Sequence, residues 1–427
     1  MTVSAQASPA PVGYLQLLRQ NRNFRVLWSG QIVTLLGDWF NLIASASLIA
    51  ALTESGAAVG GLFVVRMLAP FLVSPIAGVF ADRYNRKHLL IVTDILRAFV
   101  VLGFLFVRTP EQVWLIYVLT AIQMAGQGFF FPAKNSILPD ITSDEELGAA
   151  NALSSVTWSV MLAFGAALGG LFSGTFGVYP AFVLDALTFV VSAGILWQLR
   201  YDAPPTLDAD TSIAAGVKQY IEGLAYLRQH MDILVISIQK MSNSLFVAGA
   251  FQVIQVLIAE TYFTIGEGGG ISLGIIYGIT GIGTGLGPIV ARYFVGDDHR
   301  KLRYAILAGY GISIAGLLTV APLTSFPIVL IGAFLRGFGG GIVWVMSTQL
   351  LLQLVPLDVR GRVFSTEFAV NTLGNAIAAG SVGFLLDGIF DLPMLLTVMA
   401  GCVLFPLGIW ASWTLFGTHE KRKLTTA

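Results

Sequence analysis

Residues 78–90 read Gly78-Val-Phe-Ala-Asp82-Arg83-Tyr-Asn-Arg86-Lys87-His-Leu-Leu and form a short charged segment between two long apolar ones. Residues 57–80 precede it and residues 89–107 follow it. Each apolar run is about long enough to cross roughly 30 Å of hydrocarbon as a helix. Charges are costly in lipid, and loops rich in Lys and Arg stay in the cytoplasm. The segment therefore predicts two membrane helices that meet at the cytoplasmic face.

The composition predicts a polytopic membrane protein. Of 427 residues, 56% are hydrophobic and 11% are charged, whereas a soluble domain is roughly one quarter charged. The net charge is zero, so nothing points to nucleic acid. The single cysteine, Cys402, excludes an internal disulfide and a Cys-based metal site. The four histidines fall in loops or tails, so we expect neither a metal nor a cofactor.

Twelve apolar runs are long enough to span a membrane, in two sets of six. We expect them near residues 26–52, 57–80, 89–107, 112–133, 148–172, 178–198, 233–260, 271–295, 304–322, 326–354, 364–386 and 392–416. The predicted parts are a tail (1–25), a six-helix bundle (26–200), a linker (201–232), a second six-helix bundle (233–416) and a tail (417–427).

The distribution of cations tests this topology. Nineteen Lys and Arg residues fall in segments assigned to the cytoplasm, and Arg108 alone falls in an outer loop. An even number of spans with both termini in the cytoplasm satisfies the positive-inside rule. In the linker, apolar residues from Ile213 to Leu227 recur at helical spacing. This predicts an amphipathic helix that either lies on the membrane surface or packs on the protein's own loops.

The pattern Gly78-x-x-x-Asp82-Arg83-x-x-Arg86-Lys87 resembles the loop between helices two and three of the major facilitator superfamily of secondary transporters. The family usually has Gly where this chain has Asn85, and Asn is the residue next most tolerant of a left-handed backbone. The resemblance implies an all-α integral membrane fold of two pseudo-symmetric six-helix bundles. A faint internal repeat, with Pro-containing segments after the fourth and tenth spans, supports two halves.

Further motifs resemble the macrolide-efflux and enterobactin-exporter branch of this superfamily. They are Phe24-Arg25-x-Leu27-Trp28-x-Gly30-Gln31 with Gly37-Asp38, Phe130–Lys134 with Leu138-Pro139-Asp140, and Pro356–Ser365. In the fifth span, Phe164–Gly170 resembles the antiporter motif, with Ala166 in place of its proline. The branch implies efflux of a drug, a macrolide or a siderophore.

Placing a charged side chain within a span costs roughly 2.5 to 3.5 kcal/mol of insertion free energy, so each such residue is expected to have a structural or functional role. Those considered are Asp38, Arg66, Asp94, Arg97, Asp185, Lys240 and Arg336. Asp38 lies in a polar stripe of the first helix, formed by Gln31, Thr34, Asp38, Asn41 and Ser45. Arg66 lies at nearly the same depth, so we expect it to pair with Asp38. The pair either exchanges a proton during transport or permanently joins two helices.

By family likeness, helices one, four, seven and ten line a central cavity. Polar residues recur at i and i+4 on the last three of these helices, so each pair shares a face. They contribute either to a substrate and proton pathway or only to hydrogen bonds between helices. The predicted pathway comprises Asp38, Asn41, Thr34, Arg66, Gln123, Gln127, Gln239, Asn243 and Arg336. Trp39 and Trp344 are deep enough either to contact a hydrophobic substrate or to pack in the core.

A conformational gate is predicted at the cytoplasmic side. Asp94 and Arg97 stand three residues apart and can pair locally. In the family, the counterpart of Asp82 meets the start of helix eleven, where a helix amino terminus favours a carboxylate. The predicted gate comprises Gly78, Asp82, Arg83, Arg86, Lys87, Asp94, Arg97 and Arg362.

The sequence therefore predicts an inner-membrane antiporter rather than an enzyme, since no Walker motif, metal-ligand cluster or nucleophilic triad is found. We expect a monomer that exports a hydrophobic or amphipathic small molecule by alternating access, driven by a proton gradient. One alternative is an importer of a small nutrient, or a lipid flippase, on the same fold. Another is a membrane sensor or assembly component, although the largest loop leaves little room for a signalling domain.

Overall fold

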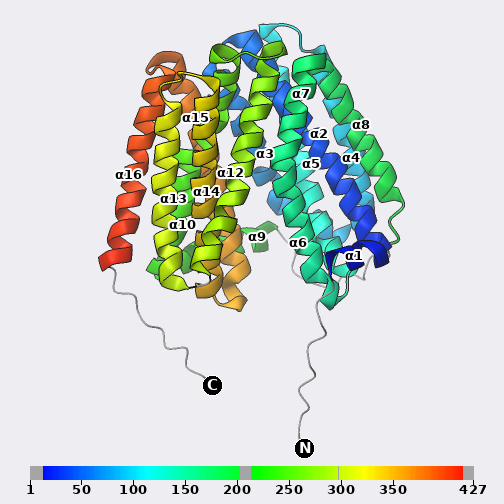
Figure 1. The fold of residues 1–427 in the computed structure, drawn as a ribbon. Coiled ribbons are helices and arrows are strands. Elements are labelled where there is room, and N and C mark those ends of the chain that lie inside the picture. The colour runs from blue at the N-terminus through cyan, green and yellow to red at the C-terminus, as the bar shows by residue number, and fades with distance from the viewer. Residues whose placement is uncertain (1–12, 202–212, 297, 417–427) are drawn as a thin grey trace, which may run out of the picture.

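The computed structural model describes residues 13–201, 213–296 and 298–416, which form helices joined by short connections (Figure 1). No strand occurs among these described residues. The helices are α1 (Tyr14–Gln20), α2 (Arg22–Thr53), α3 (Gly56–Arg83), α4 (Arg86–Leu102), α5 (Val113–Asp140), α6 (Asp144–Val160), α7 (Ala166–Phe176), α8 (Val178–Trp197), α9 (Ile213–Gln229), α10 (Met231–Asn243), α11 (Gly249–Leu257), α12 (Gly270–Val295), α13 (His299–Val320), α14 (Phe326–Leu354), α15 (Leu357–Gly388) and α16 (Leu392–Phe416).

Twelve helical segments of the described chain are long and apolar enough to cross a membrane, which confirms the predicted all-α fold. The fifth span joins α6 to α7 through a π-helical turn, Met161–Gly165. The seventh joins α10 to α11 through a second π-helical turn, Ser244–Ala248, and a third, Ile258–Tyr262, ends it. The spans form two halves, α2–α8 and α10–α16 (Figure 1).

Most of the charged segment that begins at Gly78 is helical and not a loop. α3 continues to Arg83, so only Tyr84 and Asn85 separate α3 from α4. Asn85 does not use its tolerance of a left-handed backbone, because its φ is −59°. Its side-chain oxygen instead accepts hydrogen bonds from the backbone N–H groups of Lys87 (3.0 Å) and His88 (3.3 Å). Asn caps helix amino termini well in this way, which explains its presence in place of Gly.

The linker helix α9 lies at the end of the molecule that also carries α1 (Figure 1). It contacts α3, α10 and α15, and Leu227 is buried in the main apolar core. Ile221 and Leu224 are exposed, so the described side chains of α9 do not decide between the two expected arrangements. Residues 202–212 and the side chains of residues 213–220 lie outside the described part of the chain.

The two halves meet at the end opposite α1 and α9. There α3 packs against α15, and α7 packs against α12. Glycine permits both contacts: a Cβ on Gly383 would collide with the carbonyl oxygen of Gly56, and one on Gly170 would collide with the Cα of Gly274. We call this region the closed end.

Hydrogen bonds also join the halves at the closed end. The carboxylate of Asp387, near the end of α15, accepts hydrogen bonds from the Ser55 hydroxyl (2.5 Å) and the backbone N–H groups of Gly56 (2.6 Å) and Ala57 (3.1 Å). A helix amino terminus has unpaired N–H groups and a partial positive charge, so α3 attracts this carboxylate. Asp387 therefore caps a helix of the other half.

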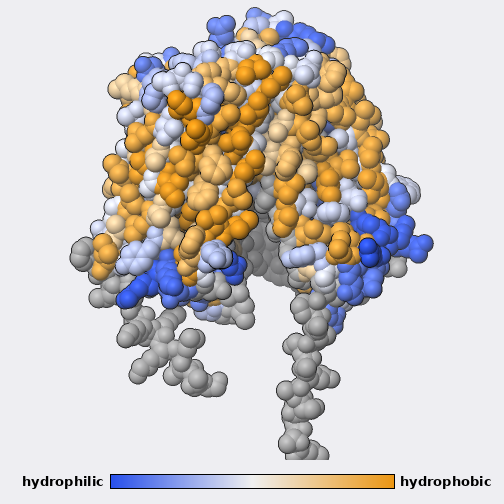
Figure 2. Space-filling view, viewed as in Figure 1, coloured by the Kyte–Doolittle hydropathy of each residue, from blue (hydrophilic) through white to orange (hydrophobic). Residues whose placement is uncertain are grey.

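At the end that carries α1 and α9, the halves are separated. Figure 2 shows a hollow between them there, with apolar residues over much of the outer flanks and polar residues at both ends. We call this region the open end. The structure is thus one state of a transporter-like fold, closed at one end and open at the other.

We predict that Gly383→Leu forces the closed end apart, because the added side chain meets the backbone of α3. The measurement is the distance between spin labels at Glu54→Cys and Ile389→Cys in a Cys402→Ser background. The distance distribution should shift to longer values. Gly408→Leu is the control, because no heavy atom lies within 4 Å of a Cβ there. An unchanged distribution in Gly383→Leu would contradict close packing at this end.

Candidate functional site

A buried ion pair lies at the centre of the first half. Arg97 Nη2 on α4 donates to Asp38 Oδ1 on α2 at 2.5 Å, and the two side chains are 1% and 9% exposed. The guanidinium also lies over the Phe189 ring of α8, 4.1 Å from its centroid. Asp94 Oδ1 is 3.9 Å from Arg97 Nη1. One arginine thus faces two carboxylates and an aromatic ring.

The expected pair between Asp38 and Arg66 is not formed. α3 packs mainly against α5 and α15, so Arg66 approaches Asp38 electrostatically without an ion pair. Its Nη1 is buried and has no hydrogen-bond partner among the described residues. Membrane depth does not identify the partner of Asp38, because Arg66 and Arg97 lie at similar depths. Arg97 faces α2 directly and forms the pair. Arg97 therefore belongs to the Asp38 cluster as well as lying beside Asp94.

Helix α8 completes this cluster. The Ser192 hydroxyl donates to Asp94 Oδ2 at 2.6 Å and accepts from the Thr34 hydroxyl at 3.0 Å. Gln123 donates to Asp185 Oδ2 at 3.4 Å, which gives Asp185 a partner. Sequence reasoning missed Ser192, because a serine in an apolar helix carries no signal of its own. Asp38 and Asp94 are therefore linked through Arg97, Ser192 and Thr34, and Asp185 has a separate amide partner on α5.

The polar stripe of α2 is buried throughout, at Gln31, Thr34, Asp38, Asn41 and Ser45. The Ser45 hydroxyl donates to Asn41 Oδ1 at 3.3 Å, while Asn41 Nδ2 has no partner among the described residues. Gln127, one turn after Gln123 on α5, is half-buried. The stripe therefore faces protein rather than lipid.

A second buried ion pair lies in the other half. Lys240 Nζ is 2.5 Å from Glu367 Oε1, and each side chain is 3% exposed. Asn371 donates to the same oxygen at 3.1 Å, and the Lys240 ammonium lies over the Trp344 ring at 4.1 Å. Sequence reasoning assigned Lys240 no role and missed Glu367. The available signal was Asn371, which follows Glu367 by one helical turn in an otherwise apolar span.

The predicted residues of helices seven and ten lie together. Asn243 on α10 faces Gly340 on α14, and its Oδ1 is buried without a partner among the described residues. The side chain of Gln239 likewise has no partner there. Arg336 Nη1 donates to the carbonyl oxygen of Val247 at 3.0 Å. Val247 belongs to a π-helical turn, and such turns alter the normal pattern of helical hydrogen bonding.

Of the predicted gate, Arg86 and Lys87 bind within the first half at the open end, whereas Asp94 and Arg97 lie in the buried cluster around Asp38. Arg86 Nη1 is 2.6 Å from Asp140 Oδ2 and 3.4 Å from the Tyr201 hydroxyl, while Lys87 Nζ donates to the Leu199 carbonyl at 2.7 Å. Partial burial raises the pKa of Tyr201, and the hydrogen bond to Asp140 raises it further. The side chains of Asp82, Arg83 and Arg362, and the surroundings of Gly78, lie outside the described part of the structure.

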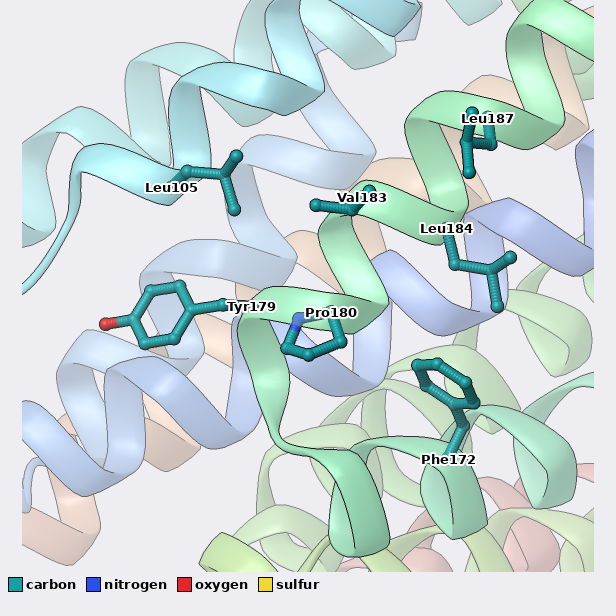
Figure 3. A pocket seen from close by; sticks show the side chains of 7 residues that line it. All are labelled: Leu105, Phe172, Tyr179, Pro180, Val183, Leu184 and Leu187. Carbon is teal, nitrogen blue, oxygen red and sulfur yellow. The ribbon is translucent and has the colours of Figure 1, made fainter.

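A separate pocket of about 520 Å³ lies on the first half, where α7 and α8 meet (Figure 3). Its lining is Leu105, Phe172, Tyr179, Pro180, Val183, Leu184 and Leu187. The Tyr179 hydroxyl already donates to the Val107 carbonyl at 2.8 Å. None of the predicted pathway residues lines this pocket, so we do not assign it to transport.

A profile of the Major Facilitator Superfamily matches residues 27–379. The chain belongs to this superfamily. Its relatives are transporters rather than enzymes. The twelve-span fold is therefore that of this superfamily.

Relatives and a solved structure extend along most of the chain. An uncharacterized MFS-type transporter, YfiS of Bacillus subtilis, is 27% identical over 96% of this chain and 97% of its own length. Macrolide efflux protein A of Streptococcus pyogenes is 24% identical over 86% of this chain and 89% of its own. The nucleoside transporter NupG superposes with a TM-score of 0.75 at 13% identity, covering 92% of this chain and 99% of that one. The last likeness shows the fold alone.

We predict that Glu367→Gln destabilises this superfamily member by about 3–5 kcal/mol, because it leaves the Lys240 ammonium buried without a carboxylate. The double variant Lys240→Met, Glu367→Gln removes both charges and should recover most of the loss. The measurement is the free energy of unfolding in mixed micelles. Glu111→Gln, at an exposed site, serves as the control. Equal losses in the single and double variants would contradict a coupled pair.

Proposed function

We propose that the chain is a secondary active exporter of the inner membrane, which moves a hydrophobic or amphipathic small molecule outward in exchange for protons. It acts as a monomer with both termini in the cytoplasm. The excess of Lys and Arg in the loops assigned to that side supports this orientation. In this orientation the open end faces the cytoplasm, so the structure represents the state that receives substrate.

The observation that carries the proposal is the ion pair between Asp38 and Arg97. A buried carboxylate that gains a proton loses its attraction to a neighbouring guanidinium. Protonation of Asp38 would therefore free Arg97 to turn to Asp94, its second carboxylate at 3.9 Å. Such an exchange of partners would break the side-chain link between α2 and α4, which both pack on α8, and so bias the halves toward the other state.

Export is supported by the resemblance to macrolide efflux protein A, which is named for efflux. Two residues of the predicted gate support alternating access. In the present state, Arg86 and Lys87 make their contacts within the first half. By the family resemblance, Asp82 would engage the start of α15 when the open end closes. Asp387 would then release α3 at the other end.

We predict that Asp38→Asn abolishes transport driven by a pH gradient while leaving folded protein in the membrane, because the amide cannot exchange the proton. A growth-sensitivity screen first identifies a compound against which expression protects. Everted vesicles with an imposed proton gradient then measure its flux.

Asp298→Asn is the matched control. Asp298 is exposed and caps α13, where the backbone N–H of Lys301 lowers its pKa, and Asn caps equally well. Retention of gradient-driven flux in Asp38→Asn would refute the coupling role. Flux in the opposite direction, with wild-type protein, would favour an importer instead.

A further inference from the structure

We propose that the apolar pocket beside α7 and α8 binds one anionic phospholipid, with an acyl chain in the pocket and the phosphate of the headgroup at Arg108. This inference goes beyond the proposed function, because it concerns a ligand taken from the bilayer and not the transported molecule. It requires only that the chain spans a membrane. We call the pocket lining, together with Arg108, the lipid site.

The pocket opens on the membrane-facing side of the first half. Val183 and Leu187 in its lining are 40% and 53% exposed, and the neighbouring Phe176 is 66% exposed. The other face of α8, which carries Asp185 and Ser192, is buried in the protein. An empty hollow on this outer side would forfeit van der Waals contacts of its walls, so an acyl chain from the surrounding bilayer fills it.

The direction and size of the pocket suit a chain that enters from a headgroup. Tyr179 and Pro180 lie in the first turn of α8, at the closed end, and Leu187 lies about 12 Å further along the helix. Its volume of about 520 Å³ is typical of a pocket that binds a small molecule. All seven lining residues are apolar or aromatic (Figure 3). The lining therefore runs from the end of the span toward its middle, as an acyl chain does.

A cation lies at the closed-end rim of this pocket. The Arg108 guanidinium lies over the Tyr179 ring, 3.6 Å from its centroid. The ring is held in place because its hydroxyl donates to the Val107 carbonyl at 2.8 Å. Figure 3 shows this hydroxyl directed away from Phe172 and Leu184. Arg108 therefore stands where the headgroup of a lipid in the pocket would lie.

The charge at the rim selects the headgroup. Arg108 is exposed and forms no ion pair with a carboxylate among the described residues. It is also the one cation that the sequence assigns to an outer loop. A guanidinium binds phosphate through paired charge-assisted hydrogen bonds. A headgroup with a net negative charge, such as phosphatidylglycerol, is favoured over phosphatidylcholine, whose own cation offsets its phosphate.

The test uses photoreactive phosphatidylglycerol and phosphatidylcholine, each with a diazirine in the same acyl chain. Each probe is added in trace amount to phosphatidylcholine nanodiscs that hold one full-length chain. Mass spectrometry then measures labelling of residues 172–187 and of the exposed Leu404 and Phe405 on α16. Phosphatidylglycerol should label residues 172–187 about fivefold more than phosphatidylcholine, with equal labelling on α16. Equal labelling of residues 172–187 by both lipids, or labelling no stronger than on α16, would overturn the proposal.

Variants separate the headgroup contact from the acyl-chain contact. Arg108→Gln should bring the ratio of the two lipids at residues 172–187 to near one. Val183→Trp should reduce labelling by both lipids, because the larger side chain fills the pocket from a position exposed enough to accept it. Glu111→Gln is the matched control, since it changes an exposed charge in the same connection and should not lower the ratio. An unchanged ratio in folded Arg108→Gln, or an equal loss in Glu111→Gln, would overturn the headgroup contact.

The same assay identifies other occupants of the pocket. Displacement of the lipid label by a compound from the growth-sensitivity screen would assign the pocket to the transported molecule and overturn the proposal. Loss of the label in nanodiscs loaded with two copies of the chain would assign this face to self-association and likewise overturn it. Because the assay needs neither substrate nor proton gradient, its result is independent of the proposed transport function.

Discussion

A charge placed within hydrocarbon must find its partner inside the protein, and this constraint organises both halves of the molecule. Asp38 with Arg97, and Lys240 with Glu367, are pairs drawn from different helices of one half. Each pair fixes how neighbouring helices face one another, because a rotated helix would leave a charge unpaired at a cost of several kcal/mol. Apolar packing alone does not impose such directions, since lipid tails are as apolar as the side chains they replace.

The fold was largely predictable because the features that indicate it depend only on the order of residues along the chain. Span length, apolar composition and the position of cations are read along the chain, and twelve spans in two halves followed from them. The partners of buried charges were not predictable in the same way. Depth in the membrane follows from residue number, whereas the direction of a side chain depends on how helices pack. Arg66 and Arg97 are similarly deep, and Arg97 reaches Asp38 because α2 and α4 both pack on α8.

Local chemistry also changed the interpretation of single residues. Asn85 occupies a position where Gly is usual, and backbone tolerance suggested a left-handed turn. The structure instead uses the side chain, which caps α4, so the same residue is explained by a different property. Glu367 could not be identified from the sequence as the partner of Lys240, because their pairing depends on how α10 and α15 pack together. Its i+4 neighbour Asn371 shows that polar pairs one turn apart deserve equal weight in apolar spans.

The two halves treat charge differently, and this difference bears on mechanism. The first half gathers three carboxylates around Arg97, an arrangement suited to exchanging a proton without leaving an arginine unpaired. The second half pairs Lys240 with Glu367, whereas Arg336 forms no ion pair with a described carboxylate and donates to the Val247 carbonyl instead. The proposed alternation between the open and closed ends requires a mechanical link between the halves. The link available here is the contact between halves, where Asp387 caps α3, the helix that carries Arg66. Movement of α3 at the closed end would displace Arg66 relative to Asp38, and so connect the contact between the halves to the buried charges through one helix.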